Sequence, residues 1–191
     1  MEGAGSGTIA QAAKREQATR GHTTIAKQEE KMRTALGVMR ESVQEGLQPD
    51  LRSVSGMAGG QAALLEKNIP DAMGGTVLGK AAAKALAVAE CNACMGKIVA
   101  APTAGACGIL PAALLTMQEE RGYSDEQLID ALFTAAAIGR VIAKRASISG
   151  AEGGCQAECG SASAMAAAAL VELAGGTAQM ASDACAFAMM N

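Results

Sequence analysis

Apolar side chains recur along most of the chain at spacings of three, four and seven residues, the spacing of one face of an α-helix. The clearest example follows Thr23 and Thr24, either of which can cap a helix that runs to about Leu47. Its apolar positions are Ile25, Met32, Leu36, Met39, Val43 and Leu47. Gly46 and Pro49 then end the helix, because glycine favours helix termination and proline cannot continue the pattern.

The same pattern, bounded by glycine, proline and capping residues, predicts helices along the rest of the chain. The Ser-Asp-Glu-Gln sequence at residues 124–127 is typical of a capping box at a helix start. The expected helices cover residues 8–20, 24–47, 60–67, 76–95, 109–120, 125–145, 162–174 and 177 onwards. No segment has the pattern of a strand, so we expect an all-α fold of seven or eight helices. Residues 1–7 are expected to form a flexible tail and residues 8–191 a single domain.

Half of the residues are apolar but only 2% are aromatic, so the core must be built mainly from alanine, leucine, isoleucine, valine and methionine. Such side chains suit close contact between helices better than the faces of a sheet. The net charge is −3 without a basic stripe, which argues against nucleic acid as a partner. The N-terminus lacks the apolar segment of a signal peptide, and no uncharged stretch is suited to span a bilayer. We therefore expect a cytoplasmic protein with no membrane partner.

Three glycine-rich segments, residues 53–60, 102–108 and 147–155, separate the expected helices and are expected to converge at one site. In the third segment, serines and a Gly-Gly pair precede Cys155, and a helix-forming run follows. A helix beginning near Cys155 directs its free N–H groups and the positive end of its dipole at the loop. That arrangement stabilises a thiolate, the form that binds metal or attacks a substrate. The alternative is an ordinary turn before a buried helix that carries an inert cysteine.

The second glycine-rich segment places Thr103 shortly before an expected helix. Its hydroxyl and the nearby backbone N–H groups suit the binding of a carboxylate. The segment lacks the Gly-Lys-Ser/Thr ending of a nucleotide-phosphate loop, so a nucleotide is not the expected ligand.

The six cysteines of a chain expected in the cytoplasm indicate free thiols, a metal site or catalysis before disulfides. Cys91 and Cys94 form a Cys-x-x-Cys pair, which needs a second pair to bind zinc, and Cys155 with Cys159 is the available candidate. Cys91 and Cys94 lie late in a helical pattern, which favours a structural role in the core. The single histidine, His22, precedes a helix and is interpreted as incidental rather than catalytic.

Three segments of the chain together resemble a known protein family. Residues 147–170 read SISGAEGGCQAECGSASAMAAAAL, residues 101–105 read APTAG and are followed by GILP at 108–111, and residues 55–60 read SGMAGG. In this order they closely resemble the iron–sulfur-dependent L-serine dehydratase α subunit, and the resemblance covers nearly the whole chain.

The resemblance implies a lyase that converts L-serine to pyruvate and ammonia without pyridoxal phosphate. Members of the family hold a [4Fe–4S] cluster with three cysteines and leave one iron open to act as a Lewis acid on the β-hydroxyl. The first of those cysteines lies in a Gly-Cys-Gln signature, which corresponds to Cys155. Thr103, Ser147 and Ser149 are candidates for holding the substrate carboxylate or hydroxyl, an expectation that rests on their chemistry and loop positions.

The resemblance also implies a β subunit as partner. In relatives the catalytic base is a histidine of a Ser-Ser-Ser-His-Thr motif in the β subunit or β domain, and His22, within Gly-His-Thr-Thr, does not match it. We therefore expect the base on a partner chain. A homo-oligomer is also compatible with the resemblance, and no role is implied for Cys91, Cys94, Cys107 or Cys159.

The other two cluster cysteines of the family belong to a later segment of the subunit, and the last expected helix is still in phase at Asn191. We expect the chain to correspond to an incomplete subunit that holds no cluster and is inactive alone, because one thiolate cannot hold a cluster. Two other hypotheses stay open. One is a helical docking module for a β subunit, with Cys155 merely buried, and the other is a zinc protein built from the two cysteine pairs.

Overall fold

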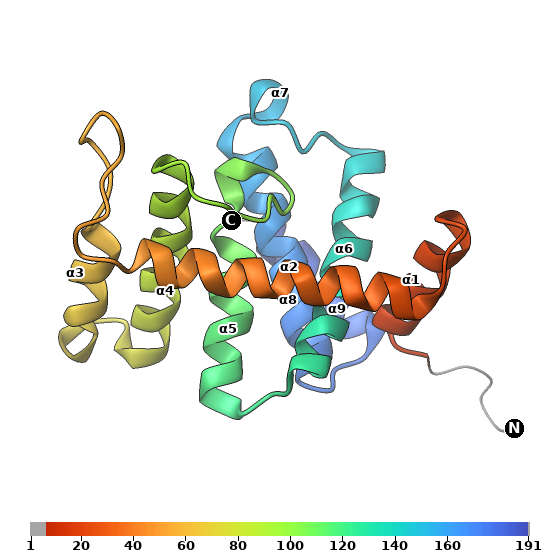
Figure 1. Cartoon of the computed structure of the whole chain (residues 1–191). Helices are drawn as coiled ribbons and strands as arrows, with labels where there is room; N and C mark the ends of the chain where they lie inside the picture. The colour runs from red at the N-terminus through yellow and green to blue at the C-terminus, as the bar shows by residue number, and fades with distance from the viewer. Residues whose placement is uncertain (1–6, 191) are drawn as a thin grey trace, which may run out of the picture.

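The computed structural model describes residues 7–190, and residues 1–6 of the expected flexible tail lie outside the described residues. Within residues 7–190 the chain forms helices and helical turns and no strand, so the all-α prediction is confirmed (Figure 1). The α-helices are α1 (Ile9–Arg20), α2 (Ile25–Gly46), α3 (Gln61–Lys67), α4 (Gly75–Ala93), α5 (Ile109–Arg121), α6 (Asp125–Arg145), α7 (Gly150–Cys155), α8 (Ser161–Leu173) and α9 (Ala178–Met189).

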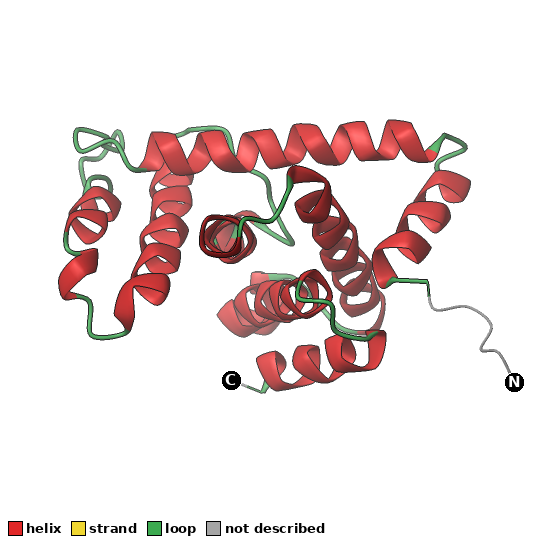
Figure 2. Cartoon of the chain, turned by 90° about the horizontal axis from the view of Figure 1, so that it is seen from below, coloured by secondary structure: helices red, strands yellow, loops and turns green. Residues whose placement is uncertain are grey.

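Helix α2 runs across the other helices and links the two ends of the molecule. In Figure 1 it passes in front of α4, α5 and α6 at a steep angle, with α3 beside α4 at one end and α1 at the other. Figure 2 shows α2 along one edge, with α8 and α9 on the opposite side. The core therefore lies between α2 and α8, and its fully buried large side chains include Leu36, Leu114, Leu128 and Phe133.

Helix α8 is the tightly packed helix that the alanine run predicts. It packs against α5, α6 and α9, and its residues Ala162, Ala164 and Ala168 have no exposed surface. Side chains of one carbon let the neighbouring helices approach closely. The closeness is visible at Gly139 of α6, where an added Cβ would lie 2.8 Å from the sulfur of Met165.

Both ends of α2 follow from the sequence. Thr24, rather than Thr23, is the cap, and its hydroxyl accepts a hydrogen bond from the backbone N–H of Lys27. At the other end Gly46 packs against the backbone of α4, because a Cβ there would lie 1.9 Å from the carbonyl oxygen of Ala87. Glycine therefore both ends the helix and allows α2 and α4 to touch.

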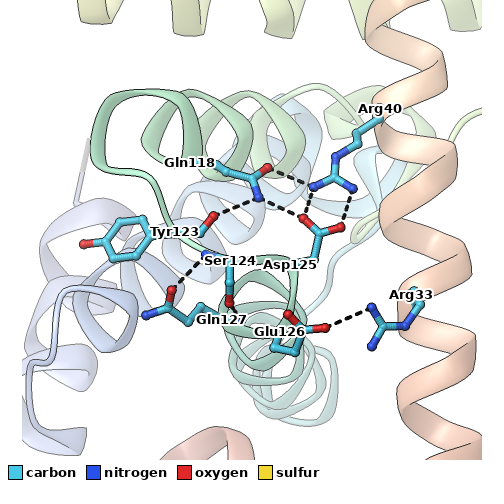
Figure 3. Close-up of polar contacts among 8 residues, drawn as sticks. All are labelled: Arg33, Arg40, Gln118, Tyr123, Ser124, Asp125, Glu126 and Gln127. Carbon is cyan, nitrogen blue, oxygen red and sulfur yellow. Dashed lines mark hydrogen bonds and ion pairs between the residues drawn. The ribbon is translucent and has the colours of Figure 1, made fainter.

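The capping box expected at residues 124–127 opens α6 (Figure 3). Ser124 Oγ accepts a hydrogen bond from the backbone N–H of Gln127 at 3.3 Å, and Gln127 Oε1 accepts one from the backbone N–H of Ser124 at 2.8 Å. Two otherwise unpaired N–H groups are thus satisfied, and the prediction is confirmed.

Two stretches depart from the expected boundaries. The helix expected over residues 76–95 ends at Ala93, and its early residues Val77 and Leu78 are 46% and 62% exposed instead of lying in the core. The segment 147–155, expected as a loop throughout, is a loop only as far as Ser149. The carbonyl of Ser149 accepts hydrogen bonds from Glu152 and Gly153, which closes the short helix α7.

A kink within α7, at Gly154, separates its first turn from the long helix that follows. This residue has φ 68° and ψ −167°, a combination essentially restricted to glycine. Cys155, with φ −56° and ψ −33°, has helical angles again, and the chain continues through a π-helical turn, Gln156–Gly160, into α8. The expected helix beginning near Cys155 is therefore present.

Candidate functional site

Two of the three glycine-rich segments meet around one carboxylate, that of Glu158 in the π-helical turn. An added Cβ at Gly105 would lie 2.6 Å from Glu158 Oε2, and one at Gly150 would lie 2.7 Å from the same oxygen. Both glycines therefore border the carboxylate so closely that a larger residue at either position would displace it. The expected convergence is confirmed for the segments 102–108 and 147–155.

The first segment, residues 53–60, lies on the same upper side of the molecule in Figure 1 as α7, although nearer to α3. Its connection to the other two runs through the C-terminal end of α4. The thiol of Cys94 lies 4.0 Å from the carbonyl oxygen of Ala58, and the side-chain amide of Asn92 donates to the carbonyl of Ala104 at 3.4 Å. The first segment is thus a neighbour of the second, at the edge of the site.

Cys155 is exposed at the start of the π-helical turn, directly after the glycine break. Its Sγ lies 3.5 Å from Sγ of Cys159, four residues further on. Burial, together with the neighbouring Cys155 thiol, raises the pKa of Cys159 above its usual range. π-Helical turns are frequent at functional sites, and here the turn places two thiols side by side next to Glu158.

The serines of the third segment contact each other and the start of α7. The hydroxyl of Ser147 donates to the carboxylate of Glu152 and accepts a hydrogen bond from the backbone N–H of Ser149 at 3.1 Å. The Ser147 hydroxyl thus orders the turn that leads into α7, and both serines are half-buried beside Gly150.

Thr103 precedes the helical turn Ala104–Ala106, and its side-chain oxygen is buried without a hydrogen-bond partner among the described residues. A buried hydroxyl that lacks a partner costs about 1–3 kcal/mol, so it is a natural position for a ligand or water to bind. The hydroxyl of Thr116, inside α5, shares this property. An unpartnered hydroxyl alone therefore does not single out Thr103 as a ligand-binding residue. Its position two residues before Gly105, at the site, is an equal part of the argument.

Two further cysteines, Cys91 and Cys107, lie in the core. Cys91 is fully buried and donates to Glu45 Oε2 at 3.4 Å, and burial raises its pKa to about 12. Cys107 is buried as well. Across residues 7–190 there is no group of three or more His, Cys, Asp or Glu side chains that could hold a metal ion. The zinc hypothesis, which needs Cys91, Cys94, Cys155 and Cys159 in one cluster, gains no support.

His22 is exposed in the turn between α1 and α2. That turn lies at the far right of Figure 1, well away from α7 and the glycine-rich segments. This placement agrees with its interpretation as incidental.

One residue of the site, Glu158, was not predicted from the sequence, and Cys159 was named only as a possible zinc ligand beside Cys155. The signal for Cys159 was its spacing of four from Cys155, which places both on one side of a helix. The signal for Glu158 is weaker, because the glycines that border it lie in other segments of the chain.

Comparison with known protein families shows to which family the chain belongs. The family described as "Serine dehydratase alpha chain" matches residues 5–191. The chain belongs to the serine dehydratase alpha-chain family. The resemblance of the glycine-rich segments is thereby confirmed at the level of the whole chain.

Curated relatives of this serine dehydratase alpha-chain sequence are similar over most of its length. A probable L-serine dehydratase alpha chain of Bacillus subtilis is 48% identical over 158 residues, which is 82% of this chain and 52% of the relative. The L-serine dehydratase alpha chain of Peptoniphilus asaccharolyticus is 43% identical over 178 residues, 92% of this chain and 61% of the relative. A probable L-serine dehydratase alpha chain of Latilactobacillus sakei is 52% identical over 112 residues, 59% of this chain and 54% of the relative. The chain therefore spans little more than half the length of these relatives.

In the described part of this family member, none of the helices has both the length and the apolar character that crossing a membrane requires.

Proposed function

We propose that this chain supplies the α-chain part of an L-serine dehydratase, which eliminates water from L-serine and yields pyruvate and ammonia. One observation carries the proposal. In a chain of this family, Cys155 has an exposed thiol and lies at the start of a helix, where two glycine-rich segments meet. A site for serine needs donors for a carboxylate and help for a poor leaving group, and this end of the molecule has side chains suited to both.

We assign Cys155 as one thiolate ligand of a [4Fe–4S] cluster. Its Sγ is exposed, whereas Cys91 and Cys107 are buried, so Cys155 is the thiol accessible to a cluster. One thiolate does not hold such a cluster, so the other ligands must come from outside the set of side chains gathered here. When bound, the cluster supplies a Lewis acid for the departing hydroxyl.

The other residues of the site bind and orient the substrate in this proposal. The unpartnered hydroxyl of Thr103 donates to the substrate carboxylate, which also gives that buried oxygen a partner. Ser147 holds the loop in place through Glu152 and the backbone of Ser149, and we assign the Ser149 hydroxyl to the substrate as well. The base that removes the α-proton lies on a partner β chain, because His22 lies outside the site.

The experiment replaces Cys155 by alanine in the complete enzyme, purified without oxygen together with its β chain. We expect the variant to lose bound iron, acid-labile sulfide and pyruvate formation together. Cys185→Ala is the matched control, since Cys185 lies on α9 with its thiol directed at the carbonyl of Ala164, and it should retain all three. Retention of iron and turnover by Cys155→Ala would remove the assigned role.

The docking-module hypothesis makes a different prediction for the same protein. It requires Cys155 to be buried and inert, and the exposure of this thiol argues against it. A docking module would also bind its β partner while carrying neither iron nor sulfide. The iron and sulfide content of the wild-type complex therefore separates the two functions.

A further inference from the structure

The paired thiols of Cys155 and Cys159 have a use that the proposed function does not require. Their sulfur atoms are 3.5 Å apart, so they must approach by about 1.5 Å to reach the length of a disulfide bond, ~2.05 Å. The turn that carries them is able to accommodate such a shift. It begins after the glycine break at Gly154, it is π-helical rather than regular, and it ends at Gly160.

Three of the other thiols are poorly placed for the same reaction. Cys91 is buried and engaged with Glu45, and Cys107 is buried. The thiol of Cys185 donates to a backbone carbonyl in α8 at 3.3 Å. Of the six cysteines, all of which lie within residues 7–190, Cys155 alone is exposed. A soluble reagent therefore meets Cys155 first, and the nearest thiol able to complete a disulfide is that of Cys159.

We propose that Cys155 and Cys159 form a reversible disulfide when the chain meets a low-molecular-weight disulfide such as oxidised glutathione. In the first step the Cys155 thiolate attacks one sulfur of the small disulfide, which gives a mixed disulfide and releases one small thiol. In the second step the Cys159 thiolate attacks Sγ of Cys155 and releases the second small thiol. Two protein thiols are oxidised and one small disulfide is reduced to two thiols.

The disulfide has a consequence that rests on the proposed function. A sulfur bonded to Cys159 is no longer a thiolate, so Cys155 is unable to bind iron until a dithiol reduces the bond. Cys159 thereby protects Cys155 from irreversible oxidation and keeps it from accepting metal under oxidising conditions. The chemistry of the pair itself holds whether or not Cys155 is a cluster ligand.

The test treats the purified 191-residue chain with oxidised glutathione, blocks the remaining thiols and digests with a protease that cleaves after glutamate. Glu152, Glu158 and Glu172 place Cys155 in the peptide 153–158 and Cys159 in the peptide 159–172. We expect these two peptides to be recovered joined, with a mass lower by two hydrogen atoms than their sum. The joined pair should exceed the glutathione adduct of Cys155 at least about tenfold, because a thiol in contact reacts at a high effective concentration.

Three variants decide the result. Cys159→Ser should leave Cys155 as its glutathione adduct, and Cys155→Ser should leave Cys159 largely unmodified. Cys185→Ser should form the joined pair as the wild type does. A stable glutathione adduct on Cys155 of the wild type, or a pair between Cys155 and Cys185, would overturn the proposal. Peptide mapping involves no iron, so a normal joined pair in the wild type together with iron retained by Cys155→Ser in the complete enzyme would support this inference and contradict the proposed function.

Discussion

The guanidinium of Arg40 in α2 donates two hydrogen bonds to the carboxylate of Asp125, the first residue of α6, at 2.9 and 2.5 Å (Figure 3). Gln118 of α5 completes the junction. It accepts from Arg40 and donates to Asp125, both at 2.9 Å, and donates to the carbonyl of Tyr123 at 3.0 Å. Three helices are therefore joined at one point, and the hydrogen bonds from Arg40 lower the pKa of Asp125 to about 2.

The first prediction concerns the acid stability of this junction. The pKa of Asp125 is lower in the folded chain than the ordinary 3.8. Its contribution to the free energy of unfolding is therefore fully present above about pH 4 and is lost as the pH falls towards 2. Asp125 is 42% exposed, so solvent screening limits that contribution to about 1 kcal/mol. We expect Asp125→Asn to lower the free energy of unfolding at pH 7 by this amount. In urea unfolding, the difference should shrink towards zero near pH 2.

Arg33 and Glu126 provide the control for that measurement. They form an ion pair at 3.3 Å between the same two helices, but both side chains are largely exposed (Figure 3). Exposed pairs of this kind contribute about 0–1 kcal/mol. Arg33→Gln should therefore have little effect at either pH. An equal effect of Arg33→Gln and Asp125→Asn on the free energy of unfolding would show that the hydrogen bonds of the junction stabilise the fold no more than an exposed ion pair does.

The second prediction compares two glycines of α2. A Cβ at Gly46 meets the backbone of Ala87 at 1.9 Å, while a Cβ at Gly37 meets nothing within 4 Å. Gly46→Ala must separate α2 from α4 and should lower the free energy of unfolding by about 3 kcal/mol. Gly37→Ala should raise it by about 0.5–1 kcal/mol, because alanine is the better helix former. Thermal unfolding of both variants tests the contact, and equal melting temperatures would contradict it.

The features that sequence analysis predicted correctly are those decided within a few neighbouring residues. The cap at Thr24 and the capping box at Ser124 depend on hydrogen bonds that span three residues. The helix beginning at Cys155 follows from the glycine before it and the alanine run after it. Such local signals fix where helices start and stop, and they were sufficient for the all-α fold.

The features that were missed depend on contacts between distant segments or on how a helix extends beyond the core. Val77 and Leu78 fit a helical pattern, but the first turns of α4 lie beyond the neighbours that would cover them. Glu158 owes its position to Gly105, more than fifty residues earlier in the chain, so no local pattern shows the contact. Of the expected site, the meeting of the segments around Thr103 and Cys155 was predictable, while the carboxylate between them was not.

The third prediction concerns the buried thiol of Cys91, whose pKa is raised from 9.0 to about 12 by burial and by Glu45. The folded chain therefore keeps this proton between pH 9 and 12, whereas the unfolded chain releases it. Stability from the neutral thiol is fully present below pH 9 and is lost as the pH rises towards 12. The advantage of the wild type over Cys91→Ala in urea unfolding should fall by up to about 1.4 kcal/mol per pH unit above pH 9.

Thiol labelling provides an independent check on Cys91. In the folded chain at pH 9, iodoacetamide should modify the exposed Cys155 and leave Cys91 unmodified. In denaturant all six cysteines should react. Modification of Cys91 in the folded chain at a rate similar to that of Cys155 would contradict both its burial and its raised pKa.

The last prediction addresses the carboxylate of Glu158, and it rests on the proposed function. An alanine at Gly150 or Gly105 places a methyl group 2.7 or 2.6 Å from Glu158 Oε2, so the carboxylate must move. Only the end of a flexible side chain shifts, and the fold should therefore keep its melting temperature within a few degrees. If Glu158 orients the substrate or the loops around it, pyruvate formation by the complete enzyme should fall about tenfold to hundredfold, because misplacement by about 1 Å has effects of that size.

Three further variants distinguish a positioning role of Glu158 from simple crowding. Glu158→Gln keeps the shape but removes the charge, so a loss of activity in this variant identifies the charge as the property that matters. Glu158→Asp in the Gly150→Ala background shortens the side chain by one carbon, relieves the contact and should restore part of the activity. Gly37→Ala, in open space on α2, should behave as the wild type in turnover. Full activity in both Gly150→Ala and Glu158→Gln would limit Glu158 to filling the space between the two glycines.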